Sequence, residues 1–303
     1  MQKLLVICGA TATGKTALGV YMAKLFVGEI ISADSRHVYK GLDIISGKDI
    51  PQDVPVWLND LVSVTEDCSV SLYQAAAVHA IQTIQNHDAL PIVVGGTGLY
   101  ISSLIRPYDT IQIPRNMPLR TKLEKEDVPE LAKHLYEIDA KKFSSMNHSD
   151  LHNPRRLIRA IEVGEWKLHH KKIPTLVPSF DVLSIGLSCD EDILKERIHK
   201  RVIERIDGGA LEEATRLENV LEVHMPAFST LGFSQLLQYL HHEVTKEALV
   251  AEWTRREYAY AKRQTRWFRK EKNIVWFDIH TSNNFAAIEK LVREWYTKKY
   301  YDN

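Results

Sequence analysis

The sequence predicts an α/β fold, in which a parallel sheet is flanked by helices and carries a helical insert. Short apolar runs alternate with segments of helical apolar spacing in the early and late parts of the chain. This alternation is typical of a parallel sheet. The pattern stops near residue 112, and polar, helix-prone sequence follows until it resumes. A chain of 303 residues is long enough for both parts. We assign residues 1–111 and 181–303 to the core and residues 112–180 to the insert.

Five apolar runs predict the strands of the sheet. They cover residues 3–9, 29–33, 90–94, 182–187 and 274–277. Each run is short, and each ends at or just before a glycine or a polar residue, which favours a buried strand over a helix.

Helices are predicted where apolar residues recur three or four positions apart. The first helix begins at Lys15 and ends at Gly28. A second helix has an apolar face formed by Ala77, Ala80, Ile81 and Ile84. In the insert, residues 119–172 are polar and helix-prone. Prolines interrupt the pattern on both sides of this segment, at Pro114, Pro118, Pro174 and Pro178.

The composition is that of an ordinary globular protein, with 45% hydrophobic and 26% charged residues. The three cysteines, Cys8, Cys68 and Cys189, form no CxxC pair, so neither a disulfide framework nor a cysteine-based zinc site is expected. A reducing compartment, the cytoplasm, fits best. No apolar stretch is long enough to span a bilayer. Basic residues outnumber acidic ones in residues 152–172 and 254–272, although charge alone favours solvated helix faces there over a polyanion site.

The strongest local motif is a phosphate-binding loop, or P-loop. It matches the pattern G-x-x-x-x-G-K-[ST] in full and consists of Gly9, Ala10, Thr11, Ala12, Thr13, Gly14, Lys15 and Thr16. The motif lies between a predicted strand and a predicted helix, so we expect a core like that of P-loop NTPases. The backbone N–H groups and the helix N-terminus would bind phosphate oxygens. Lys15 would neutralise phosphate charge, and the Thr16 hydroxyl would reach Mg²⁺. The motif leaves open which phosphate compound is bound, and a nucleotide or metabolite kinase is one alternative.

Two further segments follow predicted strands. Asp34 stands at the carboxyl end of the second strand, beside the P-loop, where ligands bind in such sheets. It could hold Mg²⁺ through water or act as a general base, or it could merely cap a helix. Residues 95–98, which include Thr97, follow the third strand and could equally be a plain turn.

Residues 190–206 are predicted to form a helix that begins with three acidic residues. Its buried stripe is predicted to be Leu194, Ile198 and Val202. Its arginines stand four positions apart on another face, at Arg197, Arg201 and Arg205. They could clamp a pyrophosphate group, although the spacing alone favours a solvated face.

Residues 260–269 mix cations with aromatic side chains. This mixture suits a nucleic acid, because cations neutralise phosphates and aromatic rings stack on bases. Alternatively, the segment belongs to an amphipathic helix that buries Trp253, Tyr260 and Trp267 at seven-residue spacing. Both hypotheses can hold, since one face can pack while the other binds.

Taken in order, these motifs resemble those of the bacterial-type tRNA dimethylallyltransferases, also called tRNA isopentenylpyrophosphate transferases. The likeness runs from about residue 4 to residue 278. Besides the P-loop, it rests on residues 31–35, 38–44, 93–101, 153–156, 159–163, Arg197, Arg201, 231–233, 261–264 and 267–269.

The resemblance implies that the P-loop binds dimethylallyl pyrophosphate with Mg²⁺. The target is adenosine 37 of the tRNA anticodon loop, flipped out of its stack. Asp34 would take a proton from its N6 amine as that amine attacks the prenyl group. The departing pyrophosphate would be stabilised by Thr11, Lys15, Thr16 and Arg201. The family further implies a monomer without membrane contact.

The resemblance also implies a set of tRNA contacts, with the insert closing on the anticodon stem. These contacts are Asp34, Ser35, Arg36, His37, Thr97, Arg155, Arg156, Arg159, Ser229, Thr230, Leu231, Gly232, Phe233 and Ser234. An adenylate isopentenyltransferase, which acts on free nucleotide, shares the P-loop and the aspartate, but the large insert argues against it. A non-catalytic tRNA-binding protein would not need Lys15, Thr16 and Asp34.

The chain departs from the family pattern mainly at positions expected to face tRNA. His37 replaces a usual Gln, and Val56-Trp57 replaces a usual His-His pair. Ile-Ser-Gly-Lys at residues 45–48 replaces Gly-Thr-Ala-Lys. Ser229-Thr230 stands where a Gln is common, and Glu257-Tyr258 aligns with a usual Thr-Arg. The sequence therefore predicts the chemistry more firmly than the recognition of tRNA.

Overall fold

The chain divides into two compact units. A computed structural model describes residues 2–108, 110–170, 180–280 and 284–298. The first unit comprises Met1–Ile105 and Pro178–Asn303, and the second comprises Arg106–Val177. The interrupting prolines Pro174 and Pro178 lie outside the described residues.

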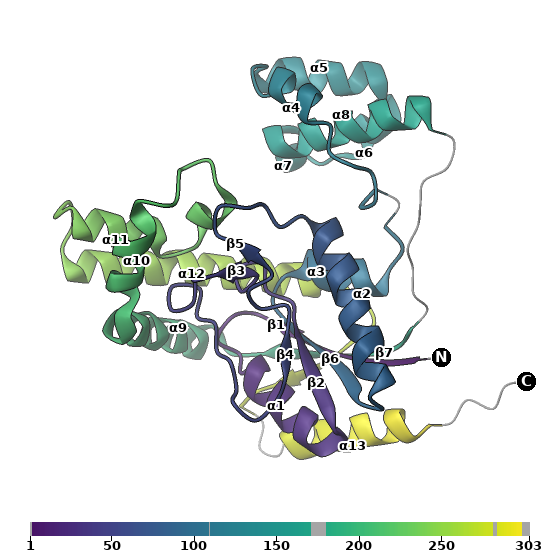
Figure 1. Cartoon of the computed structure of the whole chain (residues 1–303), viewed down its shortest axis with the longest axis vertical. Helices are drawn as coiled ribbons and strands as arrows, with labels where there is room; N and C mark the ends of the chain where they lie inside the picture. Colours follow the sequence, from purple (N-terminus) through teal and green to yellow (C-terminus); the bar gives the residue numbers. More distant parts are fainter. Residues whose placement is uncertain (1, 109, 171–179, 281–283, 299–303) are drawn as a thin grey trace, which may run out of the picture. The chain divides into compact units, whose positions relative to one another are not determined.

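A six-stranded parallel sheet forms the centre of the first unit (Figure 1). In spatial order its strands are β4 (Val56–Trp57), β2 (Gly28–Ser32), β6 (Leu90–Gly95), β1 (Gln2–Gly9), β7 (Phe180–Ser188) and β8 (Ile274–Asp278). Two short strands, β3 (Tyr39–Lys40) and β5 (Val62–Ser63), pair separately. All five predicted strands are confirmed. The edge strand β4 was not predicted, because two residues are too few to show a periodic pattern.

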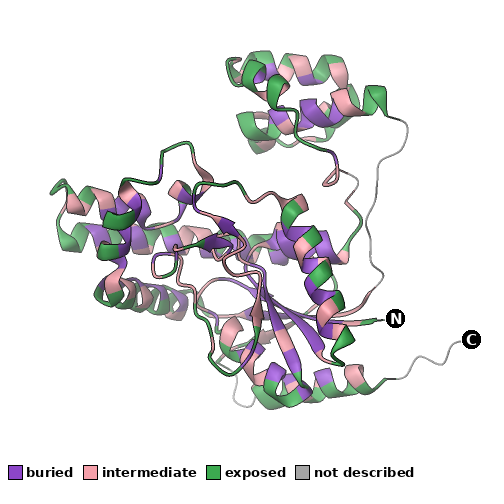
Figure 2. Cartoon of the chain, viewed as in Figure 1, coloured by how far each residue is buried: buried purple, intermediate pink, exposed green. Residues whose placement is uncertain are grey.

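Helices cover both faces of this sheet. Leu5 and Ile7 of β1 pack on one face, and Leu4 and Val6 pack on the other. The first face is covered by α1 (Lys15–Phe26) and α13 (Asn284–Thr297), and the second by α2 (Val70–Asn86) and α3 (Gly98–Ile105). Figure 2 shows the buried residues gathered in the strands and on the helix sides that face them. Burial on both faces explains why the strands read as continuous apolar runs.

The first helix ends differently from the prediction. It stops at Phe26, and Val27 takes a left-handed backbone conformation with φ of 48° while its N–H bonds to the Ala23 carbonyl. Gly28 already belongs to β2, where it is paired with Leu90. The prediction that Gly28 ends the helix was wrong because a branched residue, uncommon in this conformation, makes the turn instead.

The remaining helices of the first unit follow the later strands. They are α9 (Glu191–Arg205), α10 (Leu211–Glu218), α11 (Phe233–Leu240) and α12 (Lys246–Phe268), with a π-helical turn at Ile206–Ala210 and a 3₁₀ turn at Pro226–Ser229. The side chain of Asp190 caps α9 by accepting the N–H groups of Asp192 and Ile193. The predicted buried stripe Leu194, Ile198 and Val202 is confirmed.

Helix α12 buries a different face from the one that seven-residue spacing suggested. Trp253 is fully buried, but Tyr260 is only partly buried and Trp267 is 39% exposed. The buried positions are Leu249, Trp253, Glu257, Ala261, Gln264 and Phe268. A straight helix has 3.6 residues per turn, so a seven-residue series drifts around its surface and leaves the buried face.

Among the residues that the structure describes, the second unit contains helices, turns and irregular segments but no strand. Its helices are α4 (Met117–Leu123), α5 (Val128–Ile138), α6 (Ala140–Ser145), α7 (His148–Leu151) and α8 (Pro154–His169). They enclose a core of their own, which includes Leu123, Leu135, Leu157 and Ile161. None of the helices that the structure describes, in either unit, is long and apolar enough to cross a membrane.

Candidate active site

A cavity opens at the carboxyl ends of β1, β2 and β6, and we call it the P-loop cavity. The P-loop, the loop after β2, helix α9 and helix α12 all contribute to it. Its polar lining consists of Thr11, Lys15, Thr16, Ser32, Asp34, His37, Ser46, Asp49, Asn59, Arg201, Arg205 and Gln264, and its other lining residues are Ile30, Gly47, Pro51, Val56, Val94 and Gly95. Asp34, Lys15 and Arg201, which the sequence singled out separately, thus meet in one place.

The P-loop is shaped by its own side chains. Gly14, with φ of 84°, precedes helix α1, which starts at Lys15. Lys15 Nζ donates to the carbonyl of Ala10 at 2.5 Å, and the Thr13 hydroxyl donates to the same carbonyl at 2.8 Å. Thr13 is buried, whereas Thr11, Lys15 and Thr16 face the cavity. The motif therefore presents three of its side chains to a ligand and uses Thr13 to hold the loop.

The Gln264 side chain links the P-loop to the loop that follows β6. Its Oε1 accepts the backbone N–H of Thr11 at 2.8 Å, and its Nε2 donates to the carbonyl of Gly96 at 3.0 Å. The side chain is buried and lines the cavity. No role was predicted for Gln264 itself, although it belongs to the segment 261–264 on which the family resemblance rests.

The arginines of α9 have different surroundings: Arg197 is exposed beside the P-loop, Arg201 is partly buried against it, and Arg205 is paired with Glu257. Arg197 Nη1 lies 3.5 Å from the carbonyl of Ala12, and Arg201 Nη1 lies 3.3 Å from the Thr11 hydroxyl. Burial, together with the nearby Arg205, lowers the pKa of the Arg201 guanidinium. The spacing alone had favoured a solvated face; the structure corrects this for Arg201 and Arg205, because α9 packs against the P-loop through Leu194, Ile198 and Ala10.

Asp34 and Lys15 have perturbed acidities. Burial raises the pKa of the Asp34 carboxyl, but the nearby His37, the N–H of Arg36 and the Lys15 ammonium outweigh burial, so this pKa lies below its ordinary value. Burial lowers the pKa of the Lys15 ammonium to about 8, and Arg201 acts in the same direction. Burial also lowers the pKa of the His37 imidazole. At neutral pH the cavity therefore contains an ionised carboxylate beside a neutral imidazole.

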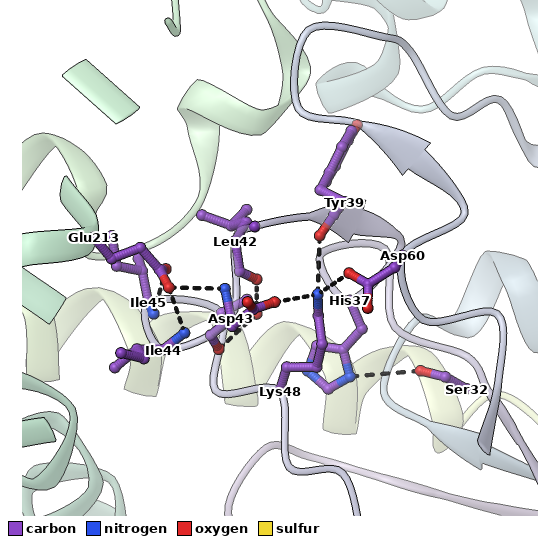
Figure 3. A network of polar contacts seen from close by, with 12 residues as sticks. Ser32, His37, Tyr39, Leu42, Asp43, Ile44, Ile45, Lys48, Asp60 and Glu213 are labelled. Atoms are coloured by element: carbon purple, nitrogen blue, oxygen red, sulfur yellow. Dashed lines mark hydrogen bonds and ion pairs between the residues drawn. The ribbon is translucent and has the colours of Figure 1, made fainter. Parts of the chain in front are cut away.

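The loop that brings Ser46 and Gly47 to the cavity is held by a network of polar contacts around the buried Lys48, drawn in Figure 3. Lys48 Nζ donates to the Tyr39 carbonyl at 2.9 Å and to the carboxylates of Asp43 and Asp60, each at 2.6 Å. From α10, the Glu213 carboxylate accepts three successive backbone N–H groups, those of Asp43, Ile44 and Ile45. These contacts fix the turn that carries Ser46 and Gly47 into the cavity.

A second pocket adjoins the P-loop cavity, and we call it the acceptor pocket. Thr11, Asp34, Ser46 and Arg205 line both. The remaining lining residues of the acceptor pocket are Ser35, Arg36, Ile45, Ser229, Thr230, Leu231, Glu257, Tyr260 and Arg263. Many predicted tRNA contacts of the first unit therefore surround the Asp34 carboxylate.

Contacts between distant loops shape this pocket. Arg36 donates to the carbonyl of Pro226 at 2.7 Å and to the Ser229 hydroxyl at 3.1 Å. Thr97, predicted to touch tRNA, accepts the Ser35 N–H at 2.9 Å. Through Thr97 and Arg36, the Asp34–His37 segment is thereby bonded to the loop after β6 and to the 3₁₀ turn at Pro226–Ser229.

Not every predicted contact reaches a surface. Phe233 is fully buried and packs edge-on against Phe228, with ring centroids 5.2 Å apart. Gly232 lies against the Trp253 ring, and the Ser234 hydroxyl accepts the Gln235 side-chain amide. The structure thus corrects the prediction for Phe233: an apolar side chain in the core cannot also touch a nucleic acid.

In the second unit, the three predicted arginines differ. Arg155 is exposed and makes no hydrogen bond to the described residues, and Arg156 pairs with Asp150. Arg159 instead donates to the carbonyls of Thr110 and Ile113 and to the buried Glu162. Arg159 therefore supports the fold of the second unit, and because its side chain is 32% exposed, its contact with tRNA stays a prediction.

The oxygen atoms near Thr16 suit a magnesium ion bound together with a phosphate ligand. Thr16 and Asp49 line the same side opening of the cavity, with Lys15 and Arg201 nearby. No group of three or more His, Cys, Asp and Glu that could hold a metal occurs in the part of the chain that the structure describes. Mg²⁺ prefers a few carboxylate or hydroxyl oxygens plus phosphate oxygens, so the site fits a shared ion. Asp49 was not singled out in the sequence because no motif contains it.

Comparisons with known proteins show the family to which the chain is similar. The family model described as IPP transferase matches residues 37–271. The tRNA dimethylallyltransferase 2 of Treponema denticola is 41% identical over 285 residues, which are 89% of this chain and 93% of that protein. The solved tRNA isopentenylpyrophosphate transferase of Bacillus halodurans aligns with a TM-score of 0.73 and 32% identity, covering 97% of each chain. A solved eukaryotic dimethylallyltransferase acting on tRNA shares the fold, with a TM-score of 0.81 and 23% identity over 100% of this chain and 81% of that chain.

Proposed function

The chain belongs to the IPP transferase family, and we propose that it is a tRNA dimethylallyltransferase. The reaction moves a dimethylallyl group from dimethylallyl pyrophosphate to N6 of adenosine 37 in the tRNA anticodon loop. The products are N6-isopentenyladenosine and pyrophosphate. One observation carries the proposal: the P-loop side chains and the Asp34 carboxylate face the same cavity, and that cavity adjoins a second pocket at Asp34.

The P-loop cavity is suited to the pyrophosphate end of the donor. Thr11, Lys15 and Arg201 bring hydroxyl and cationic groups to the mouth of α1, where the helix N-terminus already favours an anion. As the bond from C1 of the prenyl group to oxygen breaks, its electron pair moves to the pyrophosphate, whose negative charge grows. Fixed cations at this position lower the barrier by stabilising that charge.

Asp34 is suited to accept the proton of the nucleophile. Its pKa lies below the ordinary value, so the carboxylate is ionised at neutral pH. N6 of the adenine forms a bond to C1 of the prenyl group and gives up one proton, which Asp34 takes as general base. The shared position of Asp34 in both pockets allows it to reach an amine on one side and a prenyl donor on the other.

A magnesium ion fits this site through the Thr16 hydroxyl, with the Asp49 carboxylate beside it. When bound, Mg²⁺ supplies positive charge that neutralises the pyrophosphate.

We place the tRNA contacts on the acceptor pocket, through Asp34–Arg36 and Ser229–Leu231, on the neighbouring His37 and Thr97, and on Arg155 and Arg156 of the second unit. The exposed arginines of the second unit support this placement, since tRNA is a polyanion. The cytoplasmic location, the monomeric state and the absence of membrane contact stay predictions.

The decisive experiment mixes the protein with unmodified tRNA, dimethylallyl pyrophosphate and Mg²⁺ and digests the tRNA for mass spectrometry. Isopentenyladenosine in the digest is the expected result. Two parallel reactions replace tRNA with AMP, or the prenyl donor with ATP. Prenylated free nucleotide without modified tRNA, or rapid ATP hydrolysis without tRNA, would overturn the proposal.

A further inference from the structure

Arg205 occupies a fixed position that the proposed mechanism does not use. Its side chain is 10% exposed, and its Nη1 donates to Oε1 of the equally buried Glu257 at 2.7 Å. The same carboxylate oxygen lies 3.4 Å from Trp253 Nε1, and the guanidinium carbon lies 5.8 Å from the Trp253 ring centroid. A charged side chain held on two sides in this way is pre-organised to bind a ligand.

Gly47 makes room for this guanidinium. Its backbone φ is 66°, and a Cβ atom built there would stand 2.2 Å from Arg205 Nη2. A side chain at position 47 would displace the guanidinium. Gly47 in turn belongs to the loop that Lys48 and Glu213 fasten in place. The position of Arg205 is therefore set by its contacts with α12 and with the loop around Gly47. Both lie far from α9 in the sequence.

The order of the arginines along α9 indicates which substrate, the prenyl donor or the target base, would lie next to Arg205. Arg197 and Arg201 reach the P-loop at Ala12 and Thr11, whereas Arg205, one turn further on, reaches none of its atoms. Arg205 lines the P-loop cavity and the acceptor pocket alike, together with Asp34. It thus lies beyond the pyrophosphate position, where the target base would meet Asp34.

We propose that Arg205 binds the target adenine by donating a hydrogen bond to a ring nitrogen beside the reacting N6 amine. This inference rests on the proposed function. In adenine, two acceptor nitrogens, N1 and N7, flank the carbon that carries the amine. A guanidinium has five N–H donors and no acceptor, and the structure commits one donor to Glu257. An N–H group of Arg205 would bind the ring nitrogen of adenine, and the Asp34 carboxylate would bind the N6 amine beside it.

The Asp34 carboxylate disfavours guanine at the target position. Guanine presents its O6 acceptor where adenine presents the N6 amine, so the Asp34 carboxylate would face a second acceptor without a proton between them. A site that leaves buried polar groups unpaired discriminates strongly against such an analogue. Arg205 adds to this discrimination only if its partner is N1, which is an acceptor in adenine and an N–H donor in guanine, because N7 is an acceptor in both bases.

The test uses full-length protein and three anticodon stem-loop RNAs with adenosine, 1-deazaadenosine or 7-deazaadenosine at the target position. For the wild type, the RNA whose target base lacks the nitrogen bound by Arg205 should have a kcat/KM about 10- to 100-fold lower than the adenosine RNA. Arg205→Met should lower kcat/KM for adenosine by a similar factor and should no longer distinguish adenosine from that analogue. The KM for dimethylallyl pyrophosphate should stay unchanged. Comparing two enzymes on the same RNAs cancels the intrinsic reactivity of each analogue.

A double variant, Arg205→Met with Glu257→Thr, serves where the single variant folds poorly, because it leaves no unpaired buried carboxylate. It should behave like the single variant toward the three RNAs. If wild type discriminates against neither analogue, or if the discrimination survives removal of Arg205, the inference is wrong. If the wild type modifies none of the RNAs, including full-length tRNA, the proposed function itself has failed.

Discussion

The two oxygens of the Asp34 carboxylate have different surroundings. Oδ1 accepts the Arg36 N–H at 2.9 Å, whereas Oδ2 makes no hydrogen bond to any described residue. A carboxylate held by one oxygen can offer the other to a substrate proton. The pKa below the ordinary value keeps this carboxylate ionised at neutral pH, so that it can accept a proton through Oδ2.

Replacing this carboxylate tests its role. Asp34→Asn keeps the shape of the side chain but removes the proton acceptor, so turnover should fall by about 10²- to 10⁴-fold. Binding of tRNA, measured by filter retention, should change little. Asp53→Asn, at an exposed position, is the control. Turnover that survives in Asp34→Asn would place the base elsewhere.

The acidity of Lys15 predicts how donor capture depends on pH. Because burial lowers its pKa to about 8, the ammonium is charged below that pH and loses its charge above it. The kcat/KM for dimethylallyl pyrophosphate should therefore decline as the pH rises through about 8. Lys15→Arg, whose guanidinium stays charged, should abolish the decline. A profile that is flat to pH 10 in the wild type would contradict the assignment.

Among the elements, α10 stabilises a loop that it does not belong to. Glu213 accepts three backbone N–H groups of residues 43–45 and is buried. Glu213→Ala leaves these donors without their acceptor and should lower the free energy of unfolding by about 2–4 kcal/mol. Glu212→Ala, exposed on the same helix, should change it by less than about 0.5 kcal/mol. Urea denaturation of both variants measures the difference, and equal stabilities would contradict the inferred role.

For helix α8, we predict that Arg155 and Arg156 bind tRNA, whereas Arg159 supports the fold. Replacing Arg155 and Arg156 with Ala should reduce the slope of log K against log salt for tRNA binding by about one per lost phosphate contact. Replacing Arg159 should instead lower the thermal stability of the second unit, because two carbonyls and Glu162 lose a donor. An unaltered salt slope in the double variant would remove α8 from the tRNA interface.

For the whole molecule, the P-loop cavity is built entirely from the first unit. Pyrophosphate at about 100 times its Kd should therefore stabilise that unit by about 2.7 kcal/mol. Hydrogen exchange should slow in α1, α9 and α12 and stay unchanged in α5 and α8. Lys15→Ala should weaken the effect. Equal slowing in both units, or none, would contradict the placement of the ligand.

Much of the fold and part of the site follow from patterns that are local in the sequence. The strands are recognisable because apolar residues run continuously through a sheet buried on both faces. The P-loop is recognisable because phosphate binding needs particular residues at fixed spacing. Asp34 could be placed beside it because the carboxyl ends of parallel strands meet at one edge.

Other features depend on which distant segments pack together, and one sequence alone does not show this. Gln264 forms a hydrogen bond with Thr11, which lies 253 positions away in the sequence. No periodic pattern predicts a contact between residues so far apart. Gly47 and Glu257 both depart from the family pattern, and only the structure shows that they flank the same Arg205.

The sequence by itself therefore determined the α/β class, the phosphate loop and the position of Asp34 beside it, because these depend on backbone geometry and short-range spacing. The tertiary structure decided that Arg201 and Arg205 face a cavity rather than solvent, and that Phe233 and Arg159 support the fold. The physical reason is that the role of a side chain depends on its burial and its partners, and both arise only when distant segments pack against one another.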